Sequence, residues 1–281
     1  MALSGRDYAA DARNAGLNVY WVAEGDREGD IRLYAVTPAN PCCNCYSVAK
    51  AFTVTAVGLL YDRGLMTPET RVAEVLAALL PADADPKWQR VTAGHLMLHT
   101  AGFGRGLLDI DADDASLYPT DDYLKIVFSE PLAYAPGERF QYTDAAYYLL
   151  SRMVERVAGE KLSDLVRREL AVKMRFREFA WSECPQGHSM GATGLYLHTK
   201  DMVKLGILYL NRGVWEGERI LSEEWIKLVL KRGYEFTLHA GGWYAKGGMR
   251  GQMLAFHPDR GLAVAWHSFE RKNIMEVLLG E

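Results

Sequence analysis

Hydrophobic and polar residues alternate near both ends of the chain, whereas a helical period dominates between them. Near the N-terminus, Asn18 to Ala23 and Asp30 to Val36 are β-rich runs joined by a charged, Gly-containing turn, which predicts a hairpin. The turn signal Pro258-Asp259-Arg260-Gly261 joins two of the later runs and predicts a second hairpin. The later strand-like runs are Trp243 to Lys246, Gln252 to Phe256 and Leu262 to His267.

The segment between these strands is predicted to be mostly helical. The apolar stretch from Val48 to Tyr61 ends before Gly64, and Thr143 to Ala158 carries its apolar side chains on one face before Gly159. A Gly- and Asp-rich loop is expected from Gly102 to Asp122. Further helices are expected over Pro68 to Leu80, Thr92 to His99, Ser163 to Met174, Thr199 to Leu210 and Ser222 to Val229, with Thr199 and Ser222 as caps.

Strands at both ends with helices between them predict an α/β (α+β) fold. We expect one antiparallel sheet built from both termini and flanked by helices, with a mostly helical lobe inserted in the middle. The 281 residues are enough for one large domain, 1–281. Its two lobes are expected at approximately 1–64 plus 190–281, and at 65–189.

The charge distribution narrows the range of partners. The net charge is −4 with both signs scattered, so we expect no nucleic-acid partner. No segment approaches the roughly 20 apolar residues that cross a bilayer, so we expect no membrane partner. The first twenty residues contain charged side chains and no apolar core of a signal peptide, which favours a cytoplasmic location.

Two groups of residues could suggest a metal site. Three of the four cysteines lie within residues 42–45 and Cys184 stands alone, but no second ligand pair follows at zinc spacing, so we expect buried free thiols. His95 and His99 are four residues apart, yet Leu96 occupies the place where the pattern H-E-x-x-H needs a glutamate. We therefore expect no metal and no organic cofactor.

The chain contains a single S-x-x-K pattern, Ser47-Val48-Ala49-Lys50, at the start of the first long apolar helix. Residues three apart share a helical face, so the Lys50 amine can reach the Ser47 hydroxyl. A serine hydroxyl is a poor nucleophile unless a neighbour accepts its proton. The pattern therefore predicts a nucleophile, although an N-cap serine followed by a lysine would look the same.

Two more segments extend this pattern: Tyr142-Thr143-Asp144 begins a helix, and Lys246-Gly247-Gly248 ends a strand. In this order the three segments resemble those of the serine β-lactamases and penicillin-binding proteins. The resemblance is closest to the class C group with its related esterases and D-aminopeptidases, and it covers nearly the whole chain. It also includes the segments Cys45 to Thr53, Val91 to Gly102, Phe140 to Asp144 and Gly191 to Tyr196, and the turn at Pro258.

The resemblance implies a catalytic role for four residues. Ser47 would form an acyl-enzyme, and Lys50 and Tyr142 would move its proton. The backbone N–H groups of Ser47 and Met249 would form the oxyanion hole. This arrangement would act on a small ester, amide or β-lactam.

The third segment would bind substrate. Lys246 would support a phenolate at Tyr142 and contact a substrate carboxylate, while Gly247 and Gly248 would allow a close approach of the backbone. Asp144 departs from the family, whose second segment usually ends in asparagine. A carboxylate beside the first lysine would favour its ammonium form, but Asp144 could also cap its helix and face away.

These features predict a serine hydrolase acting on a small ester or amide. A true β-lactamase or a D-amino-acid peptidase remains an alternative, which the expected cytoplasmic location makes the weaker one. A ligand-binding descendant without activity is a further alternative because of Asp144. Finally, Gly187-His188-Ser189-Met190-Gly191 fits the nucleophile elbow of α/β-hydrolases, but Pro185 and Gln186 precede it where an elbow needs a strand.

Overall fold

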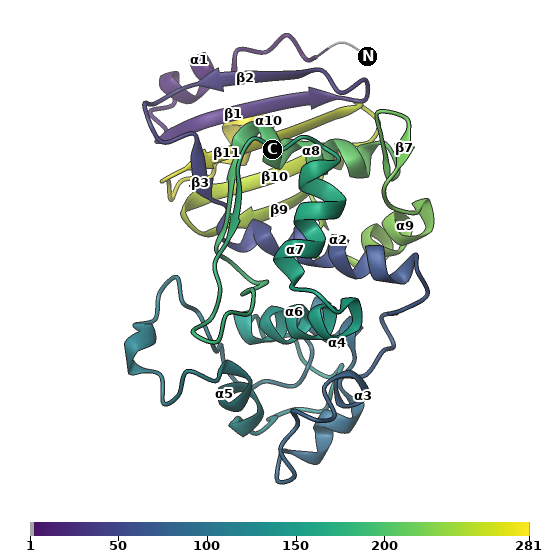
Figure 1. The fold of residues 1–281 in the computed structure, drawn as a ribbon. Helices are drawn as coiled ribbons and strands as arrows, with labels where there is room; N and C mark the ends of the chain where they lie inside the picture. The colour runs from purple at the N-terminus through teal and green to yellow at the C-terminus, as the bar shows by residue number, and fades with distance from the viewer. Residues whose placement is uncertain (1–2, 281) are drawn as a thin grey trace.

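The computed structural model describes residues 3–280 and contains a six-stranded sheet beside a mostly helical part (Figure 1). All neighbouring strands are antiparallel, in the order β2-β1-β11-β10-β9-β8. Their bounds are β1 (Val19–Asp26), β2 (Ile31–Ala35), β8 (Thr237–Leu238), β9 (Tyr244–Gly248), β10 (Gln252–His257) and β11 (Leu262–Ser268). Because β1 pairs with both β2 and β11, the sheet joins the two ends of the chain, which confirms the predicted fold class and both hairpins.

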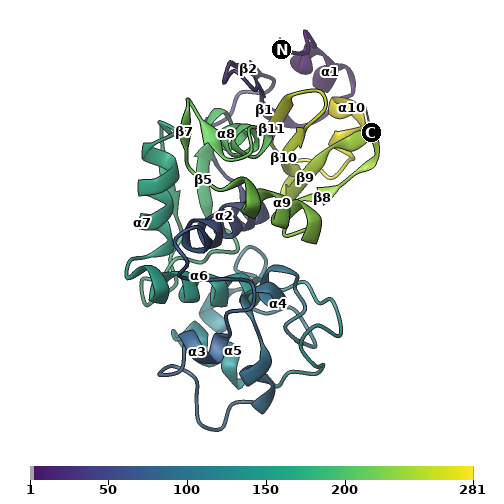
Figure 2. The same cartoon turned by 90° about the vertical axis from the view of Figure 1, so that its right-hand side faces the viewer.

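Helices cover both faces of this sheet (Figure 2). Helices α1 (Tyr8–Asn14) and α10 (Ile274–Leu279) lie on one face, and α8 (Thr199–Leu210) packs on the other against β1, β10 and β11. Successive side chains of a strand point to opposite faces, so Ala263 belongs to the α8 side and Val264 to the α1 side. The sheet is therefore buried on both faces. Helices α1 and α10 were not predicted.

Helix α2 (Ala49–Tyr61) lies between the sheet and the helical part (Figures 1 and 2). Every side chain from Ala49 to Leu60 is buried, as expected for a helix that is apolar all round. It packs against α6 (Asp144–Ala158) and α7 (Leu162–Val166). Helix α6 matches the prediction: Thr143 caps its start, and Gly159 ends it with a left-handed φ of 73°.

The remaining helices are short. Within the described residues, none of the helices is long and apolar enough to cross a membrane. Helix α7 continues as a π-helical turn over Arg167–Val172. The other helices are α3 (Val72–Val75), α4 (Ala93–Met97), α5 (Tyr123–Ser129) and α9 (Glu223–Arg232).

A second, three-stranded sheet leads into the nucleophile segment and was not predicted. Its order is β3 (Cys42–Asn44), β5 (Leu195–His198) and β4 (Phe179–Trp181), all antiparallel. Strand β3 ends just before Ser47, and β5 runs directly into α8. A two-stranded ribbon, β6 (Val214–Trp215) and β7 (Glu218–Arg219), completes the strands.

Two predicted helices are wrong in extent. Only α3 is helical within Pro68 to Leu80, because the backbone there bonds to a neighbouring segment: Ala93 N–H donates to Thr70 O, and Gly94 N–H donates to Pro68 O. The predicted helix Thr92 to His99 is shorter as α4, with Thr92 as its N-cap and Leu98 as its C-cap. In the segment Pro68 to Leu80, tertiary hydrogen bonds thus occupy the carbonyls of Pro68 and Thr70.

Two predictions about single side chains also need correction. Thr199 does not cap α8, because His198 occupies the N-cap position and the Thr199 hydroxyl bonds His267 Nδ1 at 2.7 Å. All four cysteines are free, but only Cys45 and Cys184 are buried; the pair at positions 42–43 is half-buried.

Candidate active site

Ser47 lies in a tight turn at the start of the buried helix. Residues Tyr46–Val48 form a 3-10 turn, and α2 follows from Ala49. Tyr46 adopts a left-handed φ of 47°, and the Asn44 side chain accepts a hydrogen bond from its N–H at 2.8 Å. A non-glycine residue in this conformation costs about 1–3 kcal/mol and is typical of active sites. The turn directs the half-buried Ser47 side chain to the positive end of the α2 dipole.

The structure brings Ser47, Lys50 and Tyr142 into direct contact. Lys50 Nζ lies 3.0 Å from Ser47 Oγ, and the Tyr142 hydroxyl donates to the same oxygen at 2.7 Å. The first contact follows from the spacing of three residues in sequence. The second depends on the packing of α6 against α2, since Tyr142 precedes α6 by two residues.

Asp144 faces Lys50 rather than solvent. Lys50 is fully buried, and its ammonium donates to Asp144 Oδ1 at 2.7 Å, to Ala192 O at 2.9 Å and to Ser47. These three contacts use all three donors of an ammonium group. Thr143 is the helix cap, with its hydroxyl accepting from Ala145 N–H at 3.3 Å. The alternative in which Asp144 only caps the helix is therefore wrong.

Tyr142 is a neutral phenol in this environment. Burial raises its pKa to about 12, although the nearby Lys246 ammonium acts in the opposite direction. Lys246 Nζ lies 5.5 Å from the centre of the Tyr142 ring, and Lys50 Nζ lies 4.8 Å from it. The phenol is therefore a hydrogen-bond donor to Ser47 Oγ at neutral pH.

Glu235 is a buried carboxylate that contacts two residues beside Tyr142, and the sequence analysis did not predict it. It forms a short ion pair with Lys246 Nζ through Oε2, and its Oε1 lies 3.1 Å from His99 Nε2. The Thr143 N–H donates to His99 Nδ1, so Nε2 carries the hydrogen shared with Glu235. The His99 ring packs on Tyr142 with 4.4 Å between ring centres. His99 thus supports the phenol, a role that the sequence analysis did not predict.

The end of strand β9 passes close to the nucleophile. A Cβ on Gly248 would lie 2.7 Å from Cys45 O and 3.2 Å from Ser47 N, so only glycine fits there without movement. At Gly247 the nearest atom would be Met253 Cε at 3.4 Å, an ordinary contact. The expected close approach therefore holds for Gly248 alone. Met249, the predicted second oxyanion donor, begins the turn that follows β9.

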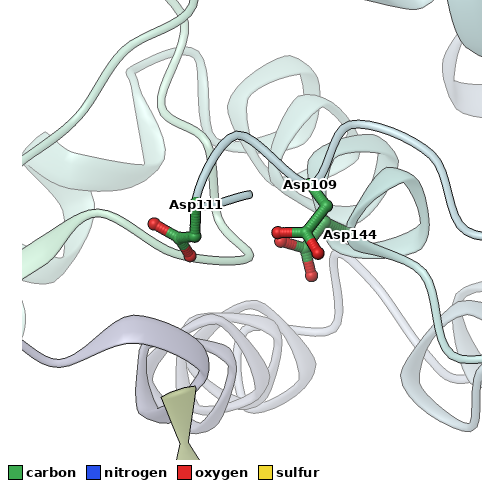
Figure 3. Close-up of side chains that lie close together, drawn as sticks. All are labelled: Asp109, Asp111 and Asp144. Atoms are coloured by element: carbon green, nitrogen blue, oxygen red, sulfur yellow. The ribbon is translucent and has the colours of Figure 1, made fainter. Parts of the chain in front are cut away.

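Three carboxylates lie together (Figure 3), and one of them, Asp144, is the ion-pair partner of Lys50. Asp109 and Asp111 come from the predicted loop, and one carboxylate oxygen of each lies within 4.8 Å of the other and of an oxygen of Asp144. Burial and then the neighbouring carboxylates raise the pKa of Asp109; burial and Asp144 also raise the pKa of Asp111. The oxygens of such a group could bind a divalent cation. Lys50 and the Thr193 hydroxyl already contact Asp144 and Asp111, respectively.

Ser189 does not have the surroundings of a nucleophile elbow. Its side chain is fully buried, and its hydroxyl accepts a hydrogen bond from Ser163 N–H at 3.1 Å. Its backbone forms an isolated bridge with Glu183 instead of a turn from strand to helix. The neighbouring His188 bonds to Glu155. The Ser189 hydroxyl therefore has a structural partner, and the adjacent histidine, His188, is paired with Glu155.

Sequence and structure comparisons relate this chain to known proteins. A family described as Beta-lactamase matches residues 9–276. Esterase EstB from Burkholderia gladioli is 32% identical over 143 residues, which cover 47% of this chain and 36% of the relative. Penicillin-binding protein 4 from Amycolatopsis lactamdurans is 30% identical over 207 residues, which cover 63% of this chain and 53% of the relative. The chain thus spans about a third to a half of these two relatives.

A solved structure shows the same fold over a similar length. The penicillin-binding protein from Bacillus halodurans superimposes with a TM-score of 0.72, covering 98% of each chain at 18% sequence identity. At this identity the likeness concerns the fold alone.

Proposed function

This chain belongs to the β-lactamase family, and from that premise we propose that it is a serine hydrolase that cleaves a small ester or amide through an acyl-enzyme on Ser47. One observation carries the proposal. Ser47 Oγ, Lys50 Nζ and Asp144 Oδ1 form a continuous hydrogen-bonded chain, with distances of 3.0 and 2.7 Å. Such a chain gives a serine hydroxyl the proton acceptor that a nucleophile requires. The esterase among the relatives favours an ester substrate.

The ion pair determines how the proton moves. Because a carboxylate stabilises the ammonium form of its partner, Lys50 cannot simply accept another proton. Tyr142 cannot accept one either, since it is a neutral phenol with a pKa of about 12. We therefore assign a relay in which Lys50 takes the Ser47 proton while it gives one of its own to Asp144.

The reaction then has two balanced halves. Ser47 Oγ attacks the substrate carbonyl carbon, and its proton passes along the relay. The same proton equivalent returns through Lys50 to the leaving alcohol or amine as the C–O or C–N bond breaks. In the second half a water molecule attacks the acyl-enzyme, its proton follows the same path, and Ser47 recovers a proton as the acid product leaves.

Two further groups assist this chemistry. Tyr142 orients Ser47 Oγ through its hydrogen bond of 2.7 Å. The N–H groups of Ser47 and Met249 are the proposed donors to the oxyanion, a contribution of about 3–4 kcal/mol per donor in other enzymes. The contact of Gly248 with the Ser47 backbone supports this pairing, because it keeps the end of β9 beside the nucleophile.

The test compares two serines in one assay. We expect Ser47→Ala to lower kcat for hydrolysis of 4-nitrophenyl acetate by at least about a thousandfold, the scale of losses for catalytic serines. Ser189→Ala serves as the matched control. It removes a buried hydrogen bond worth about 1 kcal/mol of stability but no reacting group, so folded protein should keep its rate. Loss of activity in Ser189→Ala alone would refute the proposal.

A further inference from the structure

The contacts of Glu235 bear on which substrates the site accepts. Glu235 follows α9 and adopts a left-handed φ of 64° with its side chain buried. A glutamate does not favour this conformation, so the surrounding contacts must hold it there. The strained backbone of Glu235 lies at the candidate active site, because its two carboxylate oxygens contact His99 and Lys246 beside Tyr142.

The carboxylate of Glu235 is charged and fully engaged. Burial opposes the charged form, but the Lys246 ammonium and the hydrogen bond from His99 outweigh it and hold the pKa of Glu235 well below its usual range. Its Oε2 is occupied by Lys246 and its Oε1 by His99. The exposed fractions of the Lys246 and Glu235 side chains are only 11% and 4%. The pair is therefore largely desolvated.

Both lysines near the nucleophile therefore have a carboxylate partner. Lys50 is matched by Asp144, and Lys246 is matched by Glu235. Asp109 and Asp111 add further carboxylates on the side of Lys50. A substrate carboxylate that approaches Lys246 loses its hydration and is repelled by the negative charge of Glu235. Because Lys246 is already paired with Glu235, its attraction for the substrate carboxylate offsets only a small part of this desolvation cost.

We propose that Glu235 is a specificity-determining residue: by neutralising Lys246, it directs the site toward substrates without a carboxylate. This inference rests on the proposed function, since it concerns the substrates of the Ser47 reaction. It replaces the sequence-based expectation that Lys246 contacts a substrate carboxylate. It also separates this chain from enzymes whose substrates carry a carboxylate, such as a true β-lactamase.

A pair of matched esters tests the proposal. 3-Acetoxybenzoate carries a carboxylate on its leaving group, whereas its methyl ester is uncharged and of similar size. We expect the wild-type protein to have the higher kcat/KM for the methyl ester, after correction for spontaneous hydrolysis. In Glu235→Gln, an isosteric change that frees the Lys246 charge, the ratio should shift toward the acid by at least about tenfold.

The control is Glu155→Gln, which removes a half-buried carboxylate from a pair with His188 away from Ser47. It should leave the ratio of the two substrates unchanged. A merely structural role of Glu235 would lower both rates together. An unchanged ratio in an active Glu235→Gln protein would therefore overturn the proposal.

Two further measurements decide the proposal even if Glu235→Gln does not fold or has no activity. First, a wild-type protein that prefers the acid by tenfold or more would contradict the proposal even if Glu235→Gln does not fold. Second, calorimetry measures the Kd of both esters in Ser47→Ala with and without Glu235→Gln, and the same shift in ratio is expected. If Ser47→Ala hydrolyses esters like the wild type, the proposed function fails, whereas the Kd ratio still decides the role of Glu235.

Discussion

Asp144 forms a buried ion pair with Lys50, and its replacement gives the relay a sharp test. In the proposed relay the Asp144 carboxylate accepts the proton that Lys50 releases. Asparagine cannot do so, and Asp144→Asn would then react only when Lys50 is already neutral. We expect the acid limb of the pH profile of kcat/KM to move to higher pH by at least about one unit. Below the apparent pKa of this limb, kcat/KM should rise about tenfold for each unit of pH.

The opposite shift has a distinct meaning. If Lys50 were already the free base in the wild type, removal of the Asp144 charge would help it to lose its proton, and the acid limb would move to lower pH. That result, or an unchanged profile, would exclude the relay. Asp62→Asn is a suitable control, because Asp62 is exposed and its carboxylate accepts a hydrogen bond from Ser222 N–H.

At the scale of elements, the distance between strand β9 and the turn before α2 is fixed by one glycine. Gly248→Ala would place a Cβ 2.7 Å from Cys45 O, a backbone atom that cannot rotate away. The end of β9 must move, and the Met249 N–H moves with it. Since a displacement near 1 Å can cost about a hundredfold, we expect a loss of that order in kcat/KM.

Gly247→Ala gives the comparison for this prediction. Its Cβ would lie on the other face of the strand, 3.4 Å from the flexible end of Met253 and 3.8 Å from Gln252 O, which are ordinary contacts. The loss should therefore be much smaller than for Gly248→Ala. Equal losses in the two variants, with unchanged melting temperatures, would show that the spacing of β9 and Ser47 is not what matters.

At the scale of the whole molecule, a buried histidine links the sheet to α8 and makes stability depend on pH. His267 lies in β11, bonded to Thr199, and burial, followed by the charge of His198, lowers its pKa from 6.5 to about 3. Below pH 6.5 the unfolded chain binds a proton that the folded chain does not. The free energy of unfolding should therefore fall as pH falls through this range, by up to about 1.4 kcal/mol per unit.

Denaturant unfolding between about pH 6.5 and 5 measures this slope before most carboxylates titrate. His267→Gln should flatten it, whatever its effect on the absolute stability. His239→Gln, at an exposed position, should leave it as in the wild type. A slope that persists in His267→Gln would place the acid sensitivity elsewhere.

The sequence predicted what depends on local spacing and strong periodicity. Ser47 and Lys50 share a face because they are three residues apart, and α6 has a clear apolar face with a glycine at its end. The helix predicted over Pro68 to Leu80 was wrong because the backbone of this segment bonds to residues 91–94, a contact that no local pattern encodes. The strands of the three-stranded sheet have 3 or 4 residues, too few for alternation to be recognised.

Glu235 shows the corresponding limit for the site. It stands between Tyr234 and Phe236 without a motif, and its role depends on long-range contacts with His99 and Lys246. Asp144 was recognised because it belongs to the segment Tyr142-Thr143-Asp144, but its contact with Lys50 became visible only in the structure. Charges brought together from distant parts of a chain are therefore the feature least accessible to sequence reasoning.

The central claim, an acyl-enzyme on Ser47, is tested most directly by mass spectrometry of protein quenched with acid during turnover of 4-nitrophenyl acetate. We expect one acetyl group on the peptide that contains Ser47, which appears within a turnover and disappears when the ester is exhausted. The group should be missing from Ser47→Ala and present in Ser189→Ala. An acetyl group on Ser189 that turns over with the substrate, or steady hydrolysis by Ser47→Ala, would contradict the account.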